Sequence, residues 1–135
     1  MLAAVPAPHI DVIDSTWIGV APTAVAPLVA DAARWAGWWP DLELRASEYR
    51  GAKGVRWLVR SAQRGRFAGS MEIWLEPVDD GVVAHYFLRL DAIGDSPSTR
   101  ECERLVHHYR TQTKRAMWSV SDIVDPGRIA RVSAP

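Results

Sequence analysis

The sequence contains one cysteine and no asparagine, and each scarcity excludes a class of site. Cys102 alone cannot form an intrachain disulfide, and a metal site built on two cysteines is excluded as well. Without asparagine the chain has no N-glycosylation acceptor and no catalytic triad that uses an Asn side chain. Because chains without disulfides are typical of reducing compartments, we expect a cytoplasmic protein.

The sequence also lacks an excess of either charge and lacks any long apolar run. Its 16 Lys and Arg residues balance 16 Asp and Glu residues. A molecule without net charge is not expected to capture nucleic acid or an anionic membrane by electrostatics alone. No stretch reaches the roughly 20 apolar residues that a membrane span needs. Residues 1–8 have neither the basic start nor the apolar centre of a signal peptide.

What the chain does have is ordinary globular composition, with 48% hydrophobic and 24% charged residues over 135 positions. This length fits one domain that can bury a sizeable core without metals or disulfides. We expect a flexible N-terminus over residues 1–8, a folded domain over residues 9–125 and a flexible tail over residues 126–135.

Alternating apolar and polar residues predict five strands. The predicted strands cover residues 9–20, 42–50, 54–62, 66–76 and 82–91. Gly51, Gly65 and the Asp-Asp-Gly triplet at 79–81 supply turns between the last four. Such short links join antiparallel neighbours, so we expect one antiparallel sheet of about five strands.

Three helices are predicted from their start and stop signals. Ala21-Pro22-Thr23 begins a short helix, and a second over residues 31–39 ends at Pro40. Ser98 and Glu101 form a capping-box pattern that opens a helix of about 26 residues before Asp125-Pro126-Gly127. One sheet and one long helix must bury each other's apolar faces, which predicts an α+β fold of the helix-grip type.

This order of elements, together with several motifs, resembles the SRPBCC superfamily, which includes START, Bet v 1, and polyketide cyclase/dehydrase and lipid-transport proteins. The matching segments are IGVAPTAV at 18–25, Ala30-Asp31 and RWAGWWP at 34–40. The run from Gly69 to Pro77, with Asp80-Gly81 and His85-Tyr86, is similar to small actinobacterial members. The resemblance covers roughly residues 9–124. It implies a START-like domain whose sheet has fewer strands, and hence a smaller or more open pocket, than in larger members.

The leading functional prediction is binding of a small hydrophobic or lipid-like molecule between the sheet and the long helix, without a cofactor or a metal. Large apolar side chains with an occasional polar group suit such a pocket. The residues expected to line it are Trp35, Trp38, Trp39, Trp57, Met71, Ile73, Tyr86, Leu88, Tyr109, Ala116 and Val120, with Trp35, Trp38 and Trp39 at its mouth. The alternative is that the tryptophans fill a small core.

Two further functions stay open. A cyclase, aromatase or dehydratase acting on a polyketide-like substrate needs a general acid or base in the cavity, and the candidates are Asp14, Tyr86 and Tyr109. Asp14 and Thr16 share the parity of the apolar residues in the first strand, so they either face the cavity or mark a bulge.

The other open function is an interaction module, and a homodimer is a further alternative. A basic cluster would dock an acidic partner or RNA through the outer sheet face, or it is simply a solvated outer surface. Its members are Arg50, Lys53, Arg56, Arg60, Arg64 and Arg66. We expect no aromatic ladder beside this cluster, and such a ladder is what single-stranded nucleic-acid binding needs. His85, His107 and His108 lack the spacing of a metal site.

Overall fold

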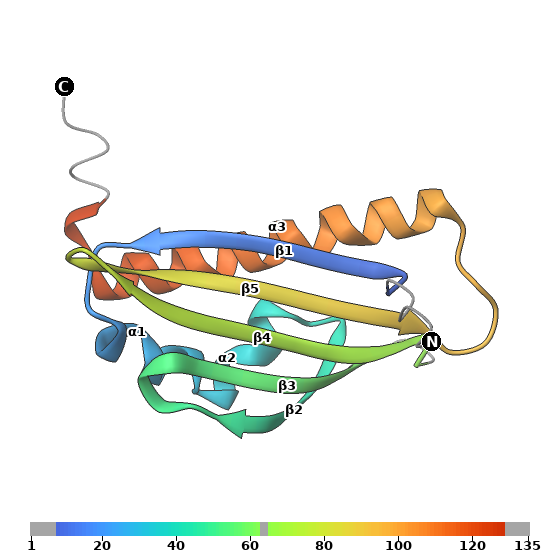
Figure 1. The fold of residues 1–135 in the computed structure, drawn as a ribbon, viewed down its shortest axis with the longest axis horizontal. Helices are drawn as coiled ribbons and strands as arrows, with labels where there is room; N and C mark the ends of the chain where they lie inside the picture. Colours follow the sequence, from blue (N-terminus) through green and yellow to red (C-terminus); the bar gives the residue numbers. More distant parts are fainter. Residues whose placement is uncertain (1–7, 63–64, 129–135) are drawn as a thin grey trace, which may run out of the picture.

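A five-stranded antiparallel sheet packs one face against a helix of 26 residues (Figure 1). The computed structural model describes residues 8–62 and 65–128, so nearly all of the two expected flexible termini lies outside the described residues. The elements in chain order are β1 (Ile10–Ile18), α1 (Pro22–Val29), α2 (Ala32–Trp38), β2 (Leu42–Tyr49), the 3-10 turn η1 (Gly51–Lys53), β3 (Gly54–Ser61), β4 (Phe67–Val78), β5 (Gly81–Ala92) and α3 (Thr99–Val124).

The sheet order is β1-β5-β4-β3-β2, and all four strand pairs are antiparallel. α1 and α2 follow β1 at one side of the sheet, while α3 runs along its inner face beside β1 (Figure 1). The predicted helix-grip fold class is therefore confirmed, with five strands, two short helices after the first strand and a long C-terminal helix.

The start of α3 forms only half of the predicted capping box. The Ser98 hydroxyl accepts a hydrogen bond from the Glu101 backbone N–H at 3.1 Å, as expected for an N-cap residue. The Glu101 carboxylate does not return to the Ser98 backbone. It accepts a 2.7 Å bond from the Arg66 guanidinium instead, because an ion pair with arginine is a stronger partner than a neutral amide.

The core lies between the inner sheet face and α3. Val12, Met71 and Leu88 from three strands are almost fully buried there, opposite Ala116 and Val120 of the helix. Full burial of one such aliphatic side chain stabilises the fold by about 1.5–3 kcal/mol. Since the buried positions alternate along β3, β4 and β5, the period-two pattern of the sequence decides which face is inside.

Asp14 and Thr16 do face inward, and they meet a lysine from α3. The Lys114 ammonium lies 3.1 Å from the Asp14 carboxylate and donates to the Ser15 carbonyl at 2.8 Å and to the Thr16 hydroxyl at 2.9 Å. The pairing of β1 with β5 is continuous from Ile10 to Ile18, so the polar residues mark no bulge. Two hydrogen bonds and one ion pair of Lys114 thus join β1 to α3.

Lys114→Met is expected to lower the free energy of unfolding by about 1–2 kcal/mol, because it leaves the Asp14 carboxylate without its counter-ion at a site only 27% exposed. Denaturant unfolding measures the change. Lys53→Met is the matched control, because Lys53 is exposed and has no ion pair within the described residues. Equal losses in the two variants would contradict the structural role of the cluster.

Candidate functional site

The deep interior between the sheet and α3 is filled by aromatic side chains. The Trp39 ring lies 5.5 Å from the Trp57 ring and stacks on Tyr86 with a centroid distance of 6.4 Å. The Trp39 indole N–H donates a 2.9 Å hydrogen bond to the Thr113 hydroxyl on α3. These groups therefore bridge the sheet and the helix across the interior.

The structure places the eleven predicted pocket residues mainly in this core. All of them except Trp38 are buried, and Trp38 is half-buried. The residues at 35, 38 and 39 pack as a cluster with Trp57 rather than around an opening. Tyr109 is the predicted residue that also lines the cleft described below.

Tyr86, one of the catalytic candidates, is sealed in the core. Its hydroxyl lies 3.4 Å from the Met71 sulfur. Burial raises the pKa of the Tyr86 phenol far above its usual value, although a hydrogen bond from Thr113 opposes the rise. Asp14, another candidate, is held by Lys114 at the seam between β1 and α3. Neither residue lines the cleft.

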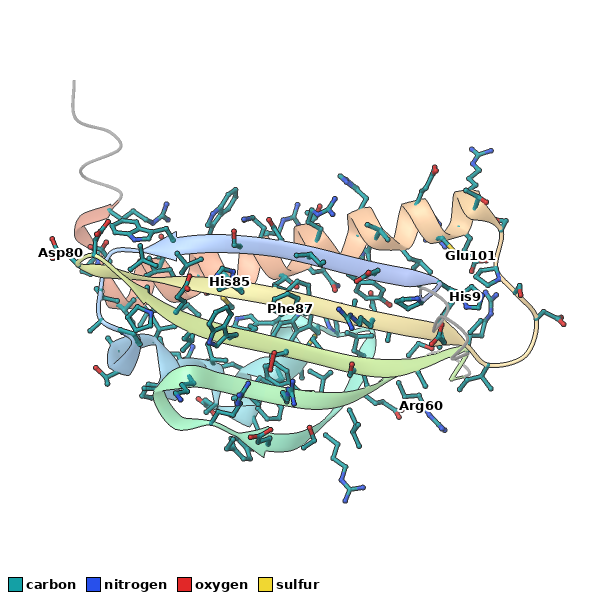
Figure 2. The ribbon with its side chains drawn as sticks, in the orientation of Figure 1. His9, Arg60, Asp80, His85, Phe87 and Glu101 are labelled. Atoms are coloured by element: carbon teal, nitrogen blue, oxygen red, sulfur yellow. The ribbon has the colours of Figure 1, made fainter. Side chains whose placement is uncertain are left out.

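A cleft of about 680 Å³ lies where the interior opens to solvent, between the first half of α3 and the adjoining ends of β3 and β4. Phe67, Leu105 and Tyr109 supply its apolar wall. The polar lining residues are Asp41, Ser61, Arg66, Glu101, Arg104 and His108. Figure 2 shows Glu101 in the first turns of α3, at the same end of the molecule as Arg60 of β3.

Two polar contacts cross the cleft and connect α3 to the sheet side. The Asp41 carboxylate lies 2.5 Å from the His108 ring nitrogen and accepts a 3.4 Å bond from the Gln112 amide. The Arg66 guanidinium donates to Glu101 at 2.7 Å. Sequence reasoning missed Asp41 and His108 because 67 positions separate them and no local motif joins them.

Tyr109 lies on the cleft wall with its ring buried. Burial, aided by the nearby Asp41 carboxylate and opposed by Arg104, raises the pKa of the Tyr109 phenol to about 12. The phenol is therefore protonated at neutral pH and remains a hydrogen-bond donor. Its hydroxyl has no hydrogen-bond partner among residues 8–62 and 65–128.

The outer sheet face corrects one expectation, since it carries aromatic side chains beside its basic ones. Trp74 stacks on His85 at 4.7 Å. His85 lies 6.5 Å from Phe87, and both are on β5 (Figure 2). The expectation was based only on the strands that carry the basic cluster. The aromatic residues lie instead on β4 and β5 of the same sheet. The basic side chains are partly neutralised, for example by the 2.7 Å contact of Arg56 with Glu72. Arg64 lies outside the described residues.

Metal-ligating groups and membrane-spanning helices are both absent from the part of the chain that the structure describes. No group of three or more His, Cys, Asp or Glu side chains in that part of the chain is arranged to hold a metal ion. Among the same residues, no helix combines the length and the apolar character needed to cross a membrane.

Comparison with known proteins assigns the fold. No protein-family model and no curated protein sequence matches this chain. Among solved structures, the Aha1 dimer from Colwellia psychrerythraea superposes with a TM-score of 0.58 at 11% identity, over 88% of this chain and 98% of that one. A START superfamily protein from Mycobacterium smegmatis gives 0.56 at 12% identity, over 86% of this chain and 97% of that one.

The chain has a START-like fold. Ara h 8.0201, which covers 83% of this chain and 94% of its own, supports the assignment with a TM-score of 0.51 at 14% identity. The resemblance to the SRPBCC superfamily is thereby confirmed at the level of the START-like fold. At such low identities the similarity establishes the fold alone, so function has to be argued from the residues of the cleft.

Proposed function

We propose that this START-like domain binds a small amphipathic molecule in the cleft at the open end of the helix grip. The observation that carries the proposal is the cleft itself, whose volume of about 680 Å³ falls within the range of small-molecule sites. Its apolar wall would bury the body of such a molecule, and its charged rim would remain near solvent.

The filled interior supports a short ligand over a long one. Thr113 lies one helical turn beyond Tyr109 on α3 and accepts a hydrogen bond from the buried Trp39, so we infer that these two side chains close the cleft from below. Four residues of α-helix span about 6 Å, so little depth remains below the Tyr109 ring. The proposal thus differs from the sequence prediction in its location, at the mouth rather than among the tryptophans.

A neutral solvatochromic dye such as Nile red tests the proposal, because its fluorescence rises in an apolar site. We expect saturable binding by the parent protein and at least about tenfold weaker binding by Leu105→Trp, whose larger side chain fills the cleft. Ile123→Trp is the matched control, since Ile123 is on the same helix, 50% exposed and outside the cleft.

Thermal melting of both variants verifies that they are folded. If Leu105→Trp binds the dye as well as Ile123→Trp does, the cleft is not the binding site and the proposal is wrong. The proposal is also wrong if the parent protein shows no saturable binding of the dye and native mass spectrometry detects no small molecule.

A further inference from the structure

In the lining of the cleft, the carboxylate acceptors have partners within the described part of the protein, whereas two donor groups do not. Its two carboxylates are engaged, Asp41 by His108 and Gln112 and Glu101 by Arg66. Both of these contacts run from α3 to residues on the opposite side of the cleft. The anionic groups of the lining are therefore held by cationic or donor partners within the protein.

Two donor groups in the same lining have no such partner. Arg104 makes no ion pair or hydrogen bond with any residue in the described part of the chain. The Tyr109 hydroxyl is likewise unpartnered there, and the phenol is protonated at neutral pH. Arg104 and Tyr109 both belong to α3 and both line the cleft.

The formal charges lead to the same conclusion. Arg66 and Arg104 balance Asp41 and Glu101, but Arg66 is already bound to Glu101 at 2.7 Å. Arg104 is left as the cation of the lining without a counter-ion in contact among the described residues. A guanidinium offers five N–H donors in a planar fork that matches the two oxygens of a carboxylate.

We infer that the cleft selects a medium-chain monocarboxylate, with its head group on Arg104 and Tyr109 and its chain on Phe67 and Leu105. The inference rests on the proposed function and specifies the chemical class of its ligand. A carboxylate would satisfy both unpartnered donors at once. In the proposed binding mode, the Trp39–Thr113 contact below Tyr109 limits the length of chain that the wall can bury.

Decanoic acid and decanol form a matched pair for the test, because they share a chain and differ in the charge of the head group. Displacement of Nile red, measured below the micelle concentration, gives both affinities. We expect decanoate to bind at least about tenfold more tightly than decanol, and Arg104→Gln to remove most of that preference. Tyr109→Phe is expected to weaken decanoate binding about threefold to tenfold, as for one hydrogen bond.

Arg100→Gln is the control for charge, because Arg100 is exposed on the same helix and lies outside the cleft. It should leave the preference for decanoate unchanged. Equal binding of decanoate and decanol would overturn the inference while the proposed function stands. A preference that survives Arg104→Gln would overturn it too. If Nile red, decanoate and decanol all fail to bind, the proposed function itself is wrong.

Discussion

Gly69→Ala is expected to lower the free energy of unfolding by about 3 kcal/mol, although it adds only one methyl group. Gly69 pairs with Leu90 where β4 and β5 approach closely. A methyl group at this position would lie 1.8 Å from the Arg89 carbonyl oxygen, whereas a carbon and a carbonyl oxygen in contact need roughly 3.3 Å. The strands must separate, because a backbone carbonyl in a ladder cannot turn away as a flexible side chain can.

Thermal and denaturant unfolding measure this effect, and a loss of about 3 kcal/mol corresponds to a fall in Tm of roughly 10 °C. Gly37→Ala is the matched control. Gly37 lies in α2 with no atom within 4 Å of the new methyl group, so alanine should stabilise the helix by about 0.5–1 kcal/mol. An unchanged Tm for Gly69→Ala would contradict the close approach of β4 and β5.

The fold could be predicted from sequence because its signals are local. Alternation identified each strand, and an N-cap serine with a terminal Asp-Pro-Gly identified the long helix. The bounds of α3, Thr99–Val124, follow from Ser98 before it and Pro126 after it. Such features depend on neighbouring residues alone, so no knowledge of tertiary contacts was needed.

The site could be predicted only in part, because its contacts join distant positions. Strand parity predicted that Trp57 and Tyr86 face inward, and helical spacing predicted the same for Tyr109, but neither pattern shows how deep each ring reaches. The bond from Trp39 to Thr113, which closes the interior, spans 74 positions. The aromatic outer face was missed for a related reason, since it depends on which strands pair side by side.

Trp39→Ala should have a large effect on stability, because Trp39 is fully buried in the core and, in the proposed binding mode, closes the cleft from below. The side chain is fully buried, packs on Trp57 and Tyr86, and donates to Thr113. Replacing a buried tryptophan with alanine costs about 3–5 kcal/mol through lost burial and the cavity left behind. Denaturant unfolding measures the loss.

Two comparison variants separate the causes of this loss. Trp39→Phe keeps an aromatic ring but removes the donor to Thr113, so we expect a smaller cost of about 1–3 kcal/mol. Trp118→Ala removes a tryptophan of α3 that is 51% exposed, and its effect should stay within about 0.5 kcal/mol. If Trp118→Ala cost as much as Trp39→Ala, the loss would not report on the core.

The same substitution should also change which ligand the cleft prefers. Without the indole, the space below Tyr109 becomes continuous with the cleft, and a longer chain can enter it. Each buried methylene contributes about 0.8 kcal/mol, so tetradecanoate should gain at least about tenfold in affinity relative to decanoate in Trp39→Ala. The gain should be absent in Trp118→Ala. If Trp39→Ala lowers stability but keeps the chain-length preference of the parent protein, Trp39 belongs to the core but does not form the floor of the cleft.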